Sequence, residues 1–210
     1  MTTQGPGQGL VEYFFDPVCP WTWNTSRWLV EVAPAEGFDI TWRSLSLTVL
    51  NRDREVPEAR LAAMKASHAA LRLVEALRAA GRGAQVGDFY TELGRRFHHD
   101  DAPRSLDEVR AAAQASGVGE RAEALEDTSW DAKIEASVDE AQSLAGKDVG
   151  SPILAIGTPR RGFFGPIVSP PPTGADALVL WRAVRDLASL PGFTELKQGR
   201  TKGPEHGPRP

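Results

Sequence analysis

Residues 10–23 read LVEYFFDPVCPWTW, and this stretch decides the fold. Its first half, residues 10–15, is short, apolar and aromatic, which is typical of a strand buried on both faces. Two prolines within residues 16–20 break the strand, and a helical pattern follows over residues 21–33. Strand character returns over residues 39–47. The order strand, helix, strand predicts the unit of a parallel sheet with a helical crossover.

The composition is that of an ordinary globular protein. The chain has 210 residues, 41% apolar and 25% charged, with a formal net charge of −4. This charge gives no basic footprint for nucleic acid. No apolar run approaches the ~20 residues that a membrane helix needs. Residues 1–9 lack a secretory leader and read as a flexible N-terminus, so we expect a cytoplasmic protein.

A long helical block interrupts the strand-bearing regions. Residues 55–146 are rich in Ala, Glu and Arg with 3.6-residue periodicity, and Ser105 with Glu108 forms a capping-box pattern. Two further strands, over residues 152–156 and 163–168, are followed by a helix. The sequence therefore predicts one sheet built from both ends of the chain, with an inserted helical domain.

These patterns set the domain boundaries that we expect. Residues 10–50 and 147–197 should form the sheet domain, and residues 55–146 the insertion. Residues 198–210, rich in Gly, Pro and charge, are predicted to be a disordered tail.

The single cysteine, Cys19, lies between a predicted strand and a predicted helix. Pro20 suits the first helical position, which makes Cys19 the expected N-cap. There the unpaired N–H groups and the helix dipole favour a thiolate, so we expect a lowered pKa and a nucleophilic sulfur. Thr22, at the third helical position, should reach the sulfur. One cysteine excludes an internal disulfide, and no zinc or other metal site is indicated.

Three segments carry a resemblance to a known family. Residues 14–28, FFDPVCPWTWNTSRW, resemble the active-site segment of the DsbA-like branch of the thioredoxin superfamily. The subgroup they resemble most is that of the actinobacterial mycothiol-dependent reductases, also called mycothiol-dependent nitroreductases. Residues 148–152, DVGSP, resemble its cis-proline loop, and residues 163–166, FFGP, resemble the strand that follows. The likeness covers residues 10–197.

The resemblance implies an α/β protein: a thioredoxin fold with a large inserted all-helical domain over the active site. It implies a cis bond between Ser151 and Pro152 that faces Cys19, with this loop offering backbone to an extended substrate. Dithiol members have a second cysteine where this chain has Thr22. Any redox cycle must therefore use an external thiol. By family likeness that thiol is mycothiol, a co-substrate, and no tightly bound cofactor is expected.

Other candidates for the site stay open between function and packing. Trp21 and Trp23, with Pro20, could form an apolar wall for a ligand, or Trp21 and Trp23 could pack in the core. His68 lies on an apolar helical stripe and is either a core histidine or a proton donor. His98 ends a predicted helix, where it either complements the helix dipole or lines the cleft.

Three functions are compatible with these residues. The first is a single-cysteine thiol oxidoreductase that reduces a small electrophilic or disulfide substrate through a mixed disulfide between Cys19 and mycothiol. The second is a redox-neutral cis–trans isomerase acting by reversible addition of Cys19 to an α,β-unsaturated, polyene-type acyl substrate. The third is a non-enzymatic binding module. All three take a small-molecule partner, neither nucleic acid nor a membrane, and a homodimer is left open.

Overall fold

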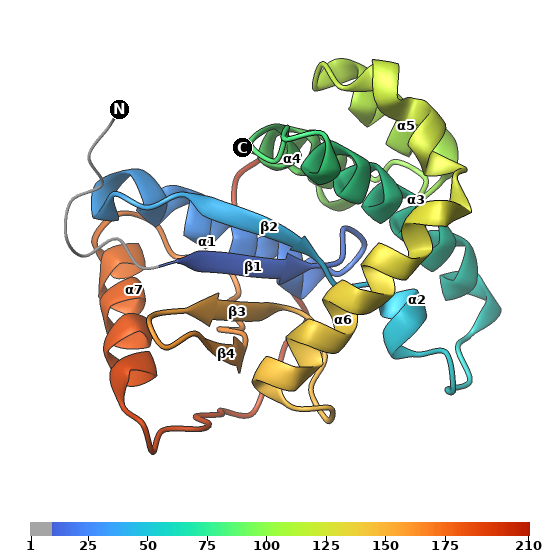
Figure 1. Ribbon diagram of the computed structural model, residues 1–210. Coiled ribbons are helices and arrows are strands. Elements are labelled where there is room, and N and C mark those ends of the chain that lie inside the picture. The colour runs from blue at the N-terminus through green and yellow to red at the C-terminus, as the bar shows by residue number, and fades with distance from the viewer. Residues whose placement is uncertain (1–9) are drawn as a thin grey trace.

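A computed structural model describes residues 10–210, and its centre is a four-stranded sheet (Figure 1). Strand β1 (Val11–Phe15) pairs in parallel with β2 (Ile40–Ser44) and antiparallel with β3 (Ile153–Ile156). Strand β3 pairs antiparallel with β4 (Arg161–Phe164), which gives the order β2-β1-β3-β4. The sheet thus joins strands from both ends of the chain, as the sequence predicts.

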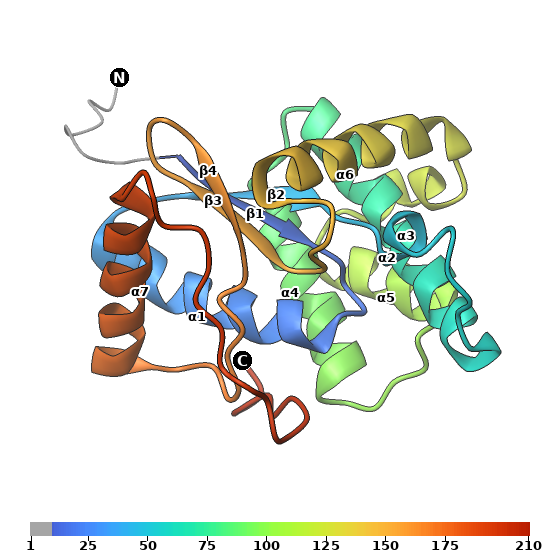
Figure 2. The same ribbon diagram turned by 90° about the horizontal axis from the view of Figure 1, so that it is seen from below.

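Two helices cover one face of this sheet (Figure 2). Helix α1 (Pro20–Glu36) crosses from β1 to β2, and α7 (Gly174–Ser189) packs beside it. The sequence predicted that α1 ends at residue 33, but it continues through Pro34. A proline so close to the helix end removes only one intrahelical bond. The helix ends at Gly37, whose φ of 72° and bond to the carbonyl of Ala33 form a left-handed cap.

The helical block lies between β2 and β3. Its helix α6 packs against the second face of the sheet, and the others pack on one another (Figure 1). Its elements are α2 (Leu47–Leu50), α3 (Glu58–Ala79), α4 (Gln85–His98), α5 (Leu106–Ala115), η1 (Gly119–Leu125), η2 (Thr128–Trp130) and α6 (Asp131–Ala145). Ser105 caps α5, because its hydroxyl accepts a bond from the N–H of Glu108; the reciprocal half of the capping box is replaced by a bond from Arg96 to the Glu108 carboxylate.

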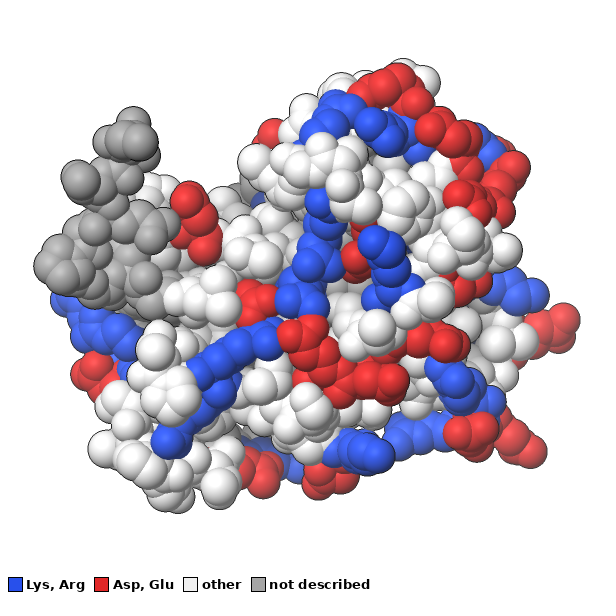
Figure 3. All heavy atoms as spheres, viewed as in Figure 1, with Lys and Arg blue, Asp and Glu red and all other residues white. Residues whose placement is uncertain are grey.

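Charged side chains of both signs alternate over the surface seen in Figure 3. Some of them form ion pairs that join the sheet to α6: Arg43 of β2 binds both Glu12 and Glu140, and Arg160 also binds Glu140. In the part of the chain that the structure describes, no helix is both long and apolar enough to cross a membrane. The expected flexible N-terminus, residues 1–9, lies outside the described residues.

The largest core cluster joins α1, the sheet and α4 through aromatic rings. Trp23 of α1 is fully buried and meets Tyr90 of α4 edge-on at 5.6 Å between ring centroids. Tyr90 also lies 4.2 Å from the ring of Phe15. The ring of Trp23 passes directly over Gly94, where an added Cβ would lie 2.0 Å from Cζ3 of the indole. This close approach fixes the insertion against the helix that follows Cys19.

We predict that Gly94→Ala destabilises the protein because the new methyl group overlaps the Trp23 ring. Overpacking of a filled core costs about 1–3 kcal/mol in the free energy of unfolding. The matched control is Gly83→Ala, since an added Cβ there meets no atom within 4 Å. Chemical denaturation measures both variants, and equal unfolding midpoints would contradict the packing described here.

Candidate active site

Cys19 is the N-cap of α1, as predicted. Its backbone is extended, with φ −77° and ψ 115°, and Pro20 begins the helix. The carbonyl of Cys19 accepts the first helical bond from Trp23, and its N–H binds the carbonyl of Asp16. A proline at the first helical position lacks the N–H that would otherwise need a partner, which is why the helix begins here.

The cis-proline loop faces Cys19 across the site. The Ser151–Pro152 bond is cis, which confirms the expectation from the family resemblance. The sulfur of Cys19 donates a long hydrogen bond of 3.9 Å to the carbonyl of Ser151. The hydroxyls of Thr22 and Ser151 lie 2.6 Å apart, and both are buried. Residues 132 positions apart in the sequence thus meet around one sulfur.

The expectation of a thiolate at Cys19 is wrong for the unliganded protein. The residue is only 7% exposed, and burial raises the pKa of the thiol above its ordinary value. The hydroxyl and N–H of Thr22 lower the pKa, but not enough to offset burial, and the charge of Asp16 raises it further. The sulfur accepts no helix-capping hydrogen bond. The helix start therefore holds a protonated thiol at neutral pH.

Asp16 holds the loop that carries the cysteine. Its buried carboxylate accepts bonds from the N–H of Val18 at 2.9 Å, the N–H of Leu47 at 2.7 Å and the hydroxyl of Ser67. Burial raises the pKa of Asp16, and the hydrogen bonds that it accepts oppose this shift. Asp16 thus caps the loop, and its partner Ser67 comes from α3.

The two tryptophans point in different directions. Trp21 is half-buried, and the guanidinium of Arg200 lies 4.9 Å from its ring centroid. Trp23 is fully buried, and its Nε1 donates to Nε2 of His99 at 3.1 Å. Trp23 therefore belongs to the core and does not line a ligand site. Only Trp21 and Pro20 remain available beside the sulfur.

Neither predicted histidine is free to act as a proton donor. His68 bridges the hydroxyl of Ser46 at 2.8 Å and the carboxylate of Asp131 at 3.0 Å, so both ring nitrogens are engaged. His98 donates from Nε2 to the carbonyl of Pro17 at 2.9 Å. Burial lowers the pKa of His98 to about 3, so it is neutral at physiological pH. His98 thus holds the active-site loop through the carbonyl of Pro17.

The C-terminal segment makes defined contacts, although residues 198–210 were predicted to be a disordered tail. Asn24, buried on α1, donates to the carbonyls of Val168 and Glu205 at 3.1 and 2.9 Å. Its amide oxygen accepts from Nδ1 of His206 at 2.7 Å. Farther along, Arg209 pairs with Asp100 of the insertion through two bonds of 2.8 Å. Composition did not predict the order of this segment, because hydrogen bonds between polar groups, and not the burial of apolar side chains, hold it.

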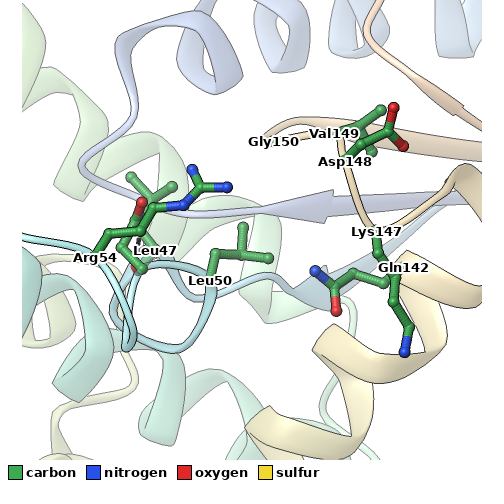
Figure 4. A pocket seen from close by; sticks show the side chains of 9 residues that line it. Leu47, Leu50, Arg54, Gln142, Lys147, Asp148, Val149 and Gly150 are labelled. Carbon is green, nitrogen blue, oxygen red and sulfur yellow. Dashed lines mark hydrogen bonds between the residues drawn. The ribbon is translucent and has the colours of Figure 1, made fainter.

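A small pocket adjoins the cis-proline loop (Figure 4). It has a volume of about 120 Å³. One wall is Leu47, Leu50, Asn51 and Arg54, and the other is Gln142 with residues 147–150. No pattern in the sequence predicts these residues as a group, because the tertiary fold brings residues 47–54 and the end of α6 together beside the loop. Within residues 10–210, no three His, Cys, Asp or Glu side chains form a group that would hold a metal ion.

Comparisons with known proteins identify the family of the chain. The model of the Rv2466c-like family, described as mycothiol-dependent nitroreductase Rv2466c, matches residues 18–198. The uncharacterized protein Rv2286c of Mycobacterium tuberculosis is 29% identical over 201 residues, which is 91% of this chain and 82% of that protein.

Solved structures show the same fold at lower identity. A probable DsbA oxidoreductase of Streptomyces coelicolor is 19% identical with a TM-score of 0.56, covering 93% of this chain and 96% of that chain. The cytosolic disulfide reductase DsbM of Pseudomonas aeruginosa, solved with GSH, is 14% identical with a TM-score of 0.57, covering 84% and 99%. The thioredoxin fold with a helical insertion is thereby confirmed.

We predict that the reactivity of Cys19 rises with pH without reaching a plateau near neutrality. Only the thiolate reacts, and a raised pKa leaves its population increasing about tenfold per pH unit over this range. Thr22→Val removes a hydroxyl that lowers the pKa, so its profile should shift to higher pH. Thr22→Ser, which keeps a hydroxyl, is the matched control. Alkylation rates between pH 6 and pH 10 test this, and a wild-type plateau below about pH 8 would contradict it.

We also predict that Asn24→Ala releases the C-terminal segment. The variant loses three hydrogen bonds, and the partners left behind cost about 1–3 kcal/mol of stability. Trypsin should then cut faster after Arg200 and Lys202, as followed by mass spectrometry. Ser189→Ala is the control, because that hydroxyl binds only within its own helix. Equal cleavage rates in the wild type and Asn24→Ala would show that these bonds do not hold the segment.

Proposed function

The chain belongs to the Rv2466c-like family of mycothiol-dependent nitroreductases and is a thiol-dependent oxidoreductase, and we propose that it works through a mixed disulfide on Cys19. The co-substrate we propose is mycothiol. The observation that carries this proposal is the single thiol of the chain, placed at the start of α1 and 3.9 Å from the carbonyl of Ser151. A second, resolving thiol is absent from the sequence, since Thr22 stands in its place.

The cycle balances with one protein thiol. The substrate is a mixed disulfide with the low-molecular-weight thiol: the Cys19 thiolate attacks the sulfur of that thiol, forms a new S–S bond to it and releases the substrate as a thiolate. A second molecule of low-molecular-weight thiol then attacks the outer sulfur of this mixed disulfide. It leaves as a small disulfide and regenerates Cys19. The external thiol is oxidised, the substrate is reduced, and the protons pass through solvent.

The roles of the surrounding residues follow from their contacts. Thr22 eases ionisation of Cys19 and is tied to the cis-proline loop through Ser151. The backbone of Ser151 and Pro152 faces the sulfur, where it can pair with an extended substrate. Pro20 and the half-buried Trp21 border the sulfur from the helix side. His68 and His98 act on the site only by holding the neighbouring backbone and side chains.

The alternative of a polyene isomerase has less support. That chemistry needs an apolar cleft beside the sulfur to hold a hydrocarbon chain. The pocket next to the cis-proline loop instead carries the polar groups of Asn51, Arg54, Gln142, Lys147 and Asp148. Such a lining suits a hydroxyl-rich ligand better than a polyene.

The test is incubation of the reduced protein with oxidised mycothiol, followed by intact mass and peptide mapping. We expect one adduct with the mass of a mycothiol moiety, located on Cys19 and removed by excess thiol. Cys19→Ser should form none. Because the thiol pKa is raised, the adduct should form faster at pH 9 than at pH 7. Failure to modify Cys19 at either pH would overturn the proposal.

A further inference from the structure

The pocket beside the cis-proline loop lies one residue away from the groups that touch the sulfur. Gly150 lines it, and the next residue, Ser151, contacts the sulfur of Cys19. On the opposite wall, the N–H of Leu47 binds Asp16, which begins the loop leading to Cys19. A molecule attached to Cys19 and running along the cis-proline loop toward Gly150 therefore arrives in this pocket.

The polar groups of this pocket are largely unused. Within residues 10–210 the side chains of Arg54, Gln142 and Lys147 make no hydrogen bond or ion pair with the rest of the chain. Figure 4 shows the guanidinium of Arg54 and the carboxamide of Gln142 reaching from opposite walls, with Leu50 between them. Arg54 supplies only donors, whereas Gln142 supplies both a donor and an acceptor.

The charges of the lining residues and the size of the pocket limit the class of ligand that can bind there. The two cations Arg54 and Lys147 are accompanied by the carboxylate of Asp148, so the pocket is not a purely cationic anion site. Its volume is about 120 Å³, and it is open to solvent where Arg54 and Lys147 are exposed. Hydroxyl groups, which both donate and accept, match this mixture of partners, and Leu47 and Leu50 offer an apolar floor for a ring.

We propose that this pocket binds the hydroxyl-rich, sugar-bearing end of the low-molecular-weight thiol whose sulfur is joined to Cys19. This inference rests on the proposed function and specifies which part of the chain recognises the thiol. Arg54, which follows α2, and Gln142 of α6 hold the hydroxyl groups, while Ser151 aligns the sulfur end. The residues that recognise the thiol molecule are thus separate from the atoms that react.

The experiment compares two disulfides that share the sulfur end. One is oxidised mycothiol, and the other is the disulfide of N-acetylcysteine methyl ester, which has no sugar. Rate constants for adduct formation on Cys19 are measured for the wild type, Arg54→Ala and Gln142→Ala. The controls are Arg52→Ala and Ser143→Ala, exposed neighbours that do not line the pocket. Thermal unfolding of each variant verifies that it folds.

We expect each pocket variant to react about 3–10-fold more slowly with oxidised mycothiol, the effect of one or two lost hydrogen bonds. Its rate with the small disulfide should change less than about twofold, and the controls should match the wild type. An equal loss with both disulfides, or no loss with either, overturns the pocket proposal. Absence of any Cys19 adduct with both disulfides in the wild type overturns the proposed function itself.

Discussion

The buried carboxylate of Asp16 is the constraint on which the site depends. Its three hydrogen bonds tie the cysteine loop to the start of α2 and to Ser67 on α3, so one group joins the sheet to the insertion. The same charge disfavours ionisation of the nearby Cys19. Asp16 thus fixes the position of the loop and at the same time raises the pKa of the Cys19 thiol. Thr22 partly offsets this, because its hydroxyl and N–H lower the pKa of the Cys19 thiol.

Features that depend on neighbouring residues were predicted correctly from the sequence. A proline after Cys19 sets the start of α1. The cis bond at Ser151–Pro152 was predicted from the resemblance of residues 148–152 to the family's cis-proline loop. The acidity of Cys19 was predicted wrongly, since it depends on burial by the Ser151 loop from the far end of the chain. The different positions of Trp21 and Trp23 were partly predictable. Two residues that are two positions apart on a helix face nearly opposite sides, so both cannot line one cleft.

Polar contacts explain what periodicity left open for His68 and what composition missed in residues 198–210. His68 belongs to an apolar stripe in sequence, yet it is fixed by Ser46 and Asp131, which lie outside α3. Residues 198–210 contain too few apolar groups to predict order, and polar contacts attach them: Asn24 binds Glu205 and His206, Ser169 accepts from the N–H of Glu205, and Arg209 pairs with Asp100. Pairings of this kind are set by the tertiary fold, so periodicity and composition do not reveal them.

The burial of Cys19 has a consequence for the direction of thiol exchange. A disulfide carries no charge, so the desolvation that penalises a thiolate does not penalise a mixed disulfide at the same place. Strongly oxidising members of this fold draw their oxidising power from a stabilised reduced cysteine. Here burial and Asp16 leave the reduced cysteine as a neutral thiol, so no stabilised thiolate opposes formation of the mixed disulfide. A sulfur in this environment holds a thiol partner until a second thiol removes it, and that behaviour suits a reductase whose resolving thiol comes from outside the chain.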